Sequence, residues 1–82
     1  MLRFFIHFRN TALLAKDDVG IDLPGLAEAK AAALASGRQV LVDNVKFNSP
    51  HPLVEVIIAS ESGEQLATIP VEDILPDSLK AE

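Results

Sequence analysis

Alternation of apolar and polar positions at the start of the chain predicts a β-strand over residues 2–9. One side of this strand is apolar and carries Leu2, Phe4, Ile6 and Phe8. The other side mixes basic and aromatic residues, namely Arg3, Phe5, His7 and Arg9. Because successive side chains of a strand point to opposite faces, we expect the apolar side to lie in the core. The segment ALLAK (12–16) can return as a second strand that resumes through Val19 and Ile21.

A helical periodicity follows over residues 26–45, LAEAKAAALASGRQVLVDNV. This segment contains six Ala, no Pro and strong helix formers throughout its first half. Its small and apolar face carries Leu26, Ala33, Leu34, Gly37, Val40 and Leu41. The opposite face carries Glu28, Gln39 and Asp43, so we predict an amphipathic helix packed against a core. Gly37 at the centre of the apolar face indicates a close approach of the helix to the sheet.

The last third of the chain predicts a second hairpin. Residues 53–59 alternate in the manner of a strand, Ser62 and Gly63 mark a tight turn, and residues 64–70 return as the fourth strand. Residues 71–75 then predict one short helical turn whose apolar side chains dock on the core.

These elements follow the order ββαββ and predict an α+β fold in a single domain over residues 1–82, with a frayed tail at 76–82. The directions of the strands allow the third strand to pair with the first. The expected sheet is therefore antiparallel and four-stranded, with the strand order 2-1-3-4. One helix covers one face of this sheet, and the other face is open to water or to a partner.

Composition narrows the classes of function. The net charge of −5 at pH 7 disfavours binding to nucleic acid or to an anionic membrane. The absence of Cys excludes a disulfide scaffold and thiolate zinc sites. No window approaches the ~18 apolar residues of a membrane span, and His7, Arg9 and Asn10 interrupt the first apolar run before it reaches the length of a signal peptide. We therefore expect a soluble, cytoplasmic protein.

The stretch DDVGIDLP (17–24) is the part of the chain richest in chemistry. Asp17, Asp18 and Asp22 would suit a divalent cation if they converged, but their spacing lacks the calcium-loop pattern. A turn that leads into the helix is the simpler interpretation, because Asp and Gly are expected turn residues. His7 and His51 are too few ligands for a zinc site, and the glycine spacing fits no phosphate or dinucleotide loop. We predict no enzymatic activity, catalytic residue, cofactor or metal. A small metal-binding or hydrolytic protein that uses these aspartates or His7 is the third hypothesis.

The open face of the sheet is the strongest candidate for function. Its candidate residues are Arg3, Phe5, His7, Arg9 and Ile57. A basic and aromatic strand can stack the bases of a single-stranded nucleic acid, but we expect Glu55 and Glu61 of the neighbouring strand to lie near the arginines. Exposed apolar side chains on a sheet often bury themselves in a partner. We predict an interaction module that forms a homodimer through the open face or an edge strand. Binding of nucleic acid or of a toxin partner, as in small antitoxin domains, is the alternative.

Several segments together resemble a known family. They are RFFIHF (3–8), DVGIDLP (18–24), LAEAKAAALAS (26–36) and the final hairpin (54–73). In this combination the chain is similar to a family of short, uncharacterised alphaproteobacterial proteins that form a domain of unknown function. The resemblance implies a ββαββ fold and brings no reaction or ligand with it. It also implies that Asp18, Gly20 and Pro24 are a structural turn signature.

Overall fold

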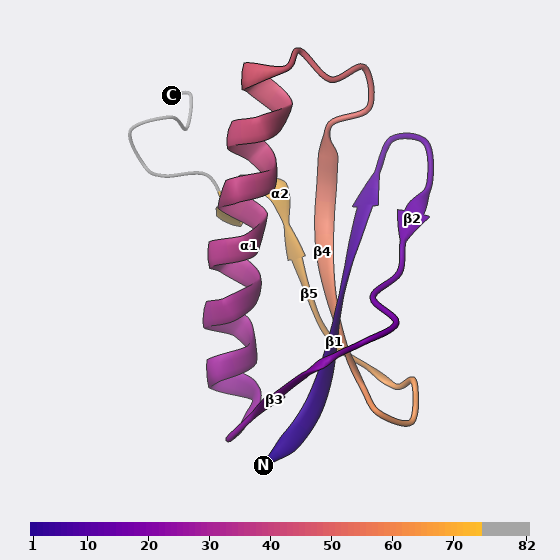
Figure 1. Ribbon diagram of the computed structural model, residues 1–82, viewed down its shortest axis with the longest axis vertical. Helices are drawn as coiled ribbons and strands as arrows, with labels where there is room; N and C mark the ends of the chain where they lie inside the picture. The colour runs from indigo at the N-terminus through magenta and orange to yellow at the C-terminus, as the bar shows by residue number, and fades with distance from the viewer. Residues whose placement is uncertain (75–82) are drawn as a thin grey trace.

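A long helix packs along one face of an antiparallel sheet in the computed structural model, which describes residues 1–74 (Figure 1). The predicted frayed tail at 76–82, and the expected docking of Leu75, lie outside the described residues. The mixed α+β class, the antiparallel sheet and the one main helix are therefore confirmed.

Within residues 1–74, five strands form the sheet. They are β1 (Leu2–Asn10), β2 (Leu14–Ala15), β3 (Ile21–Leu23), β4 (Leu53–Ser60) and β5 (Gln65–Pro70). The strand order is β2-β1-β4-β5, and β3 also pairs with β1. Every pairing is antiparallel. The central strands β1 and β4 pair from Phe4 opposite Ser60 to Asn10 opposite Leu53, with one irregularity at Arg9 and Asn10.

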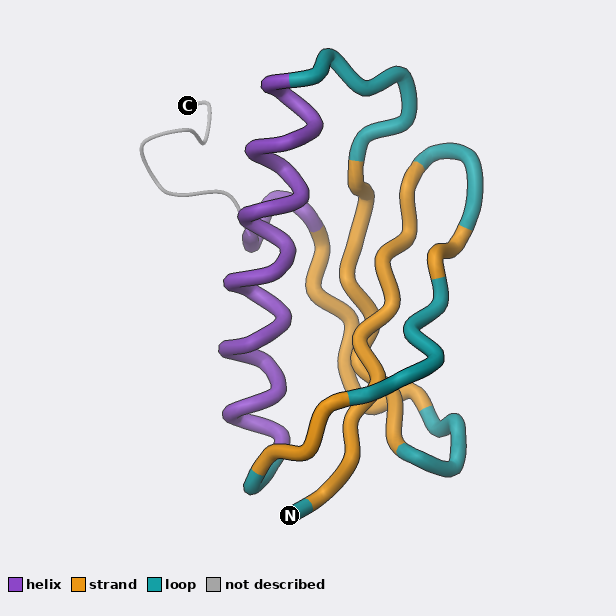
Figure 2. The backbone as a smooth tube through the Cα atoms, in the orientation of Figure 1, coloured by secondary structure: helices purple, strands orange, loops and turns teal. Residues whose placement is uncertain are grey.

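The expectation of four strands in the order 2-1-3-4 is wrong in detail at one edge. The expected second strand is split into β2 and β3, which pair with opposite ends of β1. The segment between them leaves the sheet as a loop (Figure 2). Gly20 in this loop has a φ of 81°, a left-handed conformation that a strand does not adopt. The loop therefore divides one edge strand into two short ones.

The helix α1 (Leu26–Lys46) agrees with the predicted segment, and small residues let it approach the sheet closely. Its buried residues are Ala29, Ala33 and Gly37. A Cβ atom built on Gly37 would lie 3.1 Å from Ile74 Cδ1 and 3.3 Å from Val56 Cγ2. These distances are tighter than ordinary contacts, so the close approach predicted at Gly37 is confirmed.

The core lies between α1 and the sheet. Its buried members are Phe4, Ile6, Ala29, Ala33, Leu53, Val56, Ile58 and Ile74. The short helix α2 (Val71–Ile74) places Ile74 in this core, as the sequence predicts. Arg38 of α1 fixes α2 by donating from Nε to the Ile74 carbonyl oxygen at 3.1 Å. Both helices therefore lie on the same side of the sheet.

Candidate interaction face

The predicted interaction residues share the side of the sheet that faces away from the core. Phe5 lies opposite Ala59, His7 opposite Ile57, and Arg9 opposite Glu55 in the pairing of β1 with β4. These positions alternate with the buried core positions of both strands, as the pleat of a sheet requires. The side chains of Phe5, His7 and Ile57 are half-buried. The alternation that predicted this face is present in β1 and in β4 from Glu55 onward. Leu53, which the same alternation places on this face, is buried in the core instead, because the register shifts between Arg9 and Asn10.

A shallow hollow of about 360 Å³ lies at the centre of this face. Its lining is mostly apolar near β1 and β4 and polar at the turn that joins β4 to β5. The lining residues are Phe5, His7, Leu14, Lys16, Ile57, Ala59, Ser60, Glu61, Gly63 and Gln65. We call the whole side of the sheet that faces away from the helices the open face. In the described part of the chain, both helices lie on the other side of the sheet.

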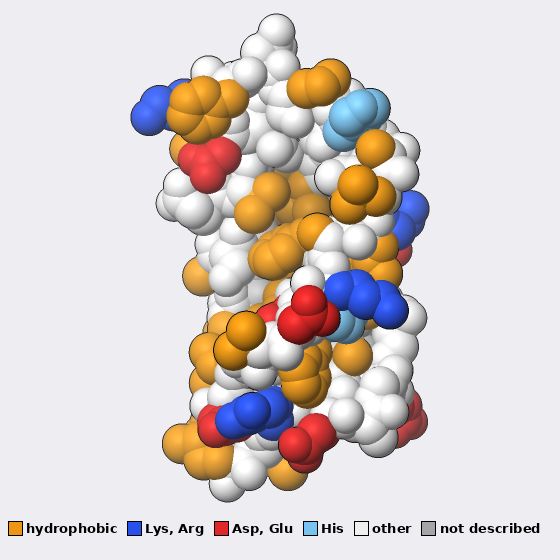
Figure 3. Space-filling model, turned by 45° about the vertical axis from the view of Figure 1, so that its right-hand side comes forward, with side chains coloured by type: hydrophobic (Ala, Val, Ile, Leu, Met, Phe, Trp, Pro, Cys, Tyr) orange, Lys and Arg blue, Asp and Glu red, His pale blue; other side chains and the backbone are white. Residues whose placement is uncertain are grey.

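Ion pairs stand at both ends of the open face. At one end the Arg3 guanidinium holds Asp22 with two bonds, Nε to Oδ1 at 2.9 Å and Nη2 to Oδ2 at 3.2 Å. At the other end Arg9 Nε donates to Glu55 Oε2 at 2.7 Å. Both pairs join residues directly opposite each other on neighbouring strands. Figure 3 shows basic and acidic side chains side by side on this flank of the molecule, around apolar ones.

The same ion pairs shift the pKa values of the paired groups. The hydrogen bond from Arg3 lowers the pKa of the Asp22 carboxyl, and Asp22 in turn raises the pKa of Arg3. The hydrogen bond to Glu55 likewise raises the pKa of Arg9. Both arginines therefore keep their charge and have a carboxylate partner within the sheet.

The acidic turn packs onto the open face rather than standing apart from it. The carboxylate of Asp17 accepts three backbone hydrogen bonds, from Val19 at 2.9 Å, Gly20 at 3.0 Å and Ile6 at 3.2 Å. The Asp17 backbone N–H donates to His7 Nδ1 at 3.0 Å. Asp17 thereby ties the loop between β2 and β3 to two adjacent residues of β1.

Opposing effects set the protonation of Asp17. Partial burial raises the pKa of its carboxyl, but the N–H donors of Gly20, Val19 and Ile6, together with the nearby His7, outweigh burial and hold the pKa below its ordinary value. Because His7 Nδ1 accepts a hydrogen bond, the neutral ring carries its proton on Nε2. The lone pair of Nδ1 is therefore used inside the fold.

Gly20 closes the turn over two residues of the open face. A Cβ atom at this position would lie 2.9 Å from Arg3 Cγ and 3.0 Å from Phe5 Cε2. No L-residue with a side chain fits there without a shift of these groups. Gly20 of the predicted structural turn therefore packs directly on the predicted interaction face.

The remaining candidates lie on the surface. Asp18 and Pro24 are exposed, the latter just before the N-cap residue Gly25 of α1. His51 Nδ1 shares a hydrogen bond with Thr11 Oγ1 at 3.0 Å, which joins two loops. Among residues 1–74, no three His, Cys, Asp or Glu side chains are grouped so that they could hold a metal ion.

Sequence reasoning missed several parts of this face. Leu14 and Lys16 line the hollow because β2 pairs with the end of β1, where Phe8 lies opposite Ala15. Arg3 finds Asp22 rather than a residue of β4 because β3 pairs with its end of β1. The signal for this second pair is the apolar alternation of Ile21 and Leu23 around Asp22, which is too short to fix a register.

Comparison with known proteins gives one match. The sequence profile of a family described as Domain of unknown function (DUF6894) matches residues 3–72. The chain belongs to this family. The match extends from the first residues of β1 into α2, so it includes the open face, the acidic turn and both hairpins of the DUF6894 fold. No match was found among curated proteins or among solved structures. Within residues 1–74 of this DUF6894 chain, neither helix is long and apolar enough to cross a membrane.

Proposed function

We propose that this DUF6894 domain is a non-enzymatic interaction module that self-associates through its open face. The observation that carries the proposal is the apolar hollow around Phe5, Leu14, Ile57 and Ala59, on the side of the sheet away from the helices. A sheet face of this kind gains stability when a second surface removes it from water.

A second copy of the chain fits this surface for two reasons. The arginines at its ends are neutralised by Asp22 and Glu55 of the same chain. The charged side chains that line the hollow, Lys16 and Glu61, have opposite signs, so a two-fold arrangement can set one against the other. The core between α1 and the sheet is also small and built partly from Ala and Gly. Burial of a second apolar layer would add the stability that a domain of this size lacks.

The hydrogen bonds of the polar residues support a role other than catalysis. A general base needs a free lone pair within reach of a substrate. The Nδ1 lone pair of His7 is occupied by the Asp17 N–H, and the Asp17 carboxylate accepts three backbone donors. These groups hold the turn on the sheet, which is a structural task.

The alternative of nucleic-acid binding finds less support on this face. Phosphate contacts need basic side chains that are available, whereas Arg3 and Arg9 are each held by a carboxylate at 2.9 and 2.7 Å. We also propose that the domain acts in the cytoplasm of an alphaproteobacterium and that Asp18, Gly20 and Pro24 are its family signature. An alignment of family members would test the signature.

Light scattering coupled to gel filtration tests the self-association. We expect a mass of twice the 8.8 kDa of the chain. Phe5→Glu and Ile57→Glu each place a charge in the hollow and should give monomers, because an unpaired charge is costly to bury. Val45→Glu is the matched control, since Val45 is 83% exposed on α1, and this variant should stay dimeric. A monomeric wild-type chain, or a dimer that survives both open-face variants, would refute the proposal.

A further inference from the structure

The two edges of the sheet differ in how they are protected. At the edge formed by β2 and β3, the strands are two and three residues long, with a polar turn between them. That turn carries Lys16, Asp17 and Asp18. Short strands, charges and interruptions are the features that keep a sheet edge from pairing with another chain.

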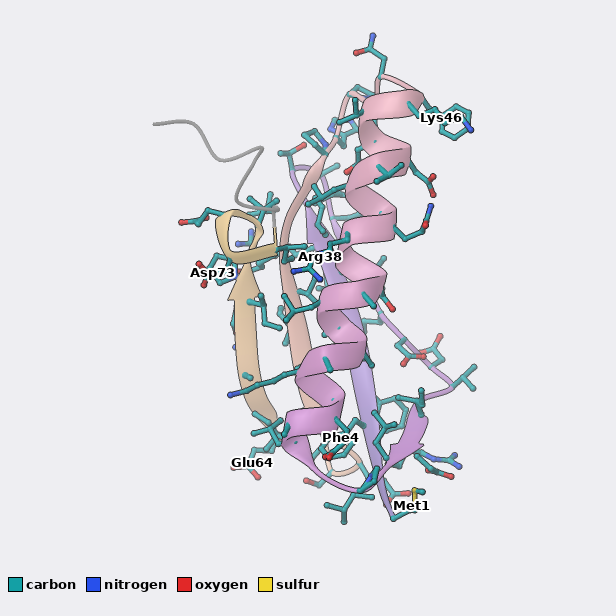
Figure 4. All side chains as sticks on the ribbon, turned by 90° about the vertical axis from the view of Figure 1, so that its left-hand side faces the viewer. Met1, Phe4, Arg38, Lys46, Glu64 and Asp73 are labelled. Atoms are coloured by element: carbon teal, nitrogen blue, oxygen red, sulfur yellow. The ribbon has the colours of Figure 1, made fainter. Side chains whose placement is uncertain are left out.

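The opposite edge is less protected, although it has a bulge at Leu66 and ends at Pro70. The strand β5 is the last in the sheet and runs six residues, Gln65–Pro70, without a charged side chain. Among residues 1–74 no strand pairs with its outer side. Figure 4 shows β5 at the margin of the molecule, with α2 at its end and α1 lying over the sheet beside it. Between the bulge at Leu66 and Pro70, which has no N–H, this uncharged edge offers backbone N–H and C=O groups to an added strand.

Acidic residues flank this edge at both ends. Glu61 and Glu64 precede β5, and Glu72 and Asp73 follow it in α2. Figure 4 labels Glu64 and Asp73 at opposite ends of the strand. Arg38 reaches the α2 end, but its Nε donates to the Ile74 carbonyl oxygen. The edge therefore presents a neutral centre between two acidic ends.

This charge pattern selects against a second copy at β5. In a symmetric antiparallel pair of two β5 strands, Glu64, which precedes β5 in one copy, would approach Glu72, which follows β5 in the α2 of the other. Like charges placed opposite each other destabilise a strand pair. A segment with an uncharged centre and basic ends has the complementary pattern.

We propose that the outer edge of β5 binds an extended segment of another protein as an added β-strand, and that this segment has a neutral, β-branched centre flanked by Lys or Arg. Backbone hydrogen bonds to Gln65–Pro70 supply the affinity. The acidic ends select the partner and disfavour self-pairing. This site is distinct from the open face because it uses the backbone edge of the sheet, although Gln65 and Glu61 at one end also line the hollow.

Fluorescence anisotropy with the labelled peptide KKTVTVTVKK tests the proposal on the full chain. We expect saturable binding, and binding at least about tenfold weaker for EETVTVTVEE, because the charges at both ends are reversed. The protein variant Glu64→Lys/Glu72→Lys should lose this preference, because Glu61 and Asp73 then balance the two new lysines. Asp43→Lys/Glu28→Lys is the matched control, with the same change of charge on exposed positions of α1, and it should keep the preference of the wild type.

Backbone methylation separates strand addition from simple charge attraction. An added strand uses the N–H groups of every second residue. Of two KKTVTVTVKK peptides, N-methylated at odd or at even central residues, one should lose about tenfold or more in affinity and the other should not. The variant Phe5→Glu should bind as the wild type does, whatever its oligomeric state.

Chemical shift changes on peptide addition should centre on the amides of residues 65–69, since Pro70 has no N–H. The proposal is overturned if the wild type does not bind the basic peptide at about 1 mM, near the weak end of specific affinities. It is also overturned if both methylated peptides bind equally, or if the shift changes fall on the open face. Protection of the same amides from hydrogen exchange without peptide would show that β5 pairs with β5 of a second copy. This result would overturn the proposal that another protein is the partner.

Discussion

The two sides of strand β1 share one backbone but end in different environments. On the helix side, Phe4 and Ile6 are 3% and 8% exposed and touch other apolar side chains. On the open side, Phe5 and His7 are half-buried under a turn that Asp17 holds in place. The helix side of β1 is a closely packed core, whereas the open side is a partly covered apolar surface with polar contacts around it.

An apolar surface of the sheet can be covered by close packing or by a hydrogen-bonded turn, and the two kinds of cover respond to different substitutions. Truncation of an apolar side chain on the helix side should lower the free energy of unfolding, because the contacts there are close-packed. The open side should respond to backbone strain, to pH and to added charge.

The largest effect is expected for Ile58→Ala on the helix side. Ile58 is fully buried in the core, so the truncation removes apolar contacts and leaves a cavity. We expect a loss of about 2–5 kcal/mol in the free energy of unfolding, measured by urea denaturation. Val42→Ala on the exposed surface of α1 is the control and should cost much less. Equal losses for Ile58→Ala and Val42→Ala would mean that Ile58 does not lie in a packed core beneath α1.

The next effect is expected for Gly20→Ala in the turn on the open side. Both Gly20 and Gly63 have positive φ angles, of 81° and 93°. A Cβ on Gly20 would meet Arg3 and Phe5, whereas one on Gly63 would meet nothing within 4 Å. Gly63→Ala should therefore cost about 1–2 kcal/mol from backbone strain alone, and Gly20→Ala about 1–2 kcal/mol more. A smaller loss for Gly20→Ala than for Gly63→Ala would contradict the packing of the turn on Phe5.

A moderate and pH-dependent effect is expected for Asp17→Asn. The Asn amide has one oxygen and cannot accept all three backbone hydrogen bonds, which should cost about 1–2 kcal/mol at pH 7. The pKa of Asp17 is lowered in the fold, so its contribution is present above the ordinary value of 3.8 and is lost as the pH falls through the lowered value.

Urea denaturation at several pH values measures this contribution. The wild type should lose stability as the pH falls below 3.8, and Asp17→Asn should lose less over the same range. Asp22 also has a lowered pKa and stays in both proteins, so a reduced slope remains in the variant. Identical slopes for the two proteins would show that Asp17 does not hold the turn.

The smallest effect on unfolding is expected for Arg9→Gln. Arg9 is exposed, and an exposed ion pair contributes little because water and salt screen it. We expect a thermal midpoint close to that of the wild type, with Arg3→Gln at the other end of the face as the parallel case. A loss as large as that of Ile58→Ala would mean that the ion pairs, rather than the core, hold β1 in place.

Much of the fold can be predicted from the sequence, because the signals are local and repeated. The apolar face of α1 extends over several turns, and the alternation of β1 and β4 fixes which residues share a face. The pair of Arg9 with Glu55 follows from that alternation once the two strands are neighbours.

The site is less predictable where it depends on the path of a short segment. Asp17 and Asp18 are adjacent residues of the same type, and only the path of the loop decides that Asp17 turns toward β1. Three residues of β3 are too few to reveal the register that places Asp22 opposite Arg3. The contact of Gly20 with Phe5 depends on both, so no pattern in the sequence could disclose it.

An isotope-filtered NOE experiment tests directly whether two chains associate through their open faces. Labelled and unlabelled chains are mixed, so that only contacts between copies give signals. We expect NOEs from the Ile57 and Leu14 methyl groups of one copy to the Phe5 ring of the other. Intermolecular NOEs confined to the exposed helix residues Val42 and Val45, or no such NOEs at concentrations where a dimer is expected, would contradict this association.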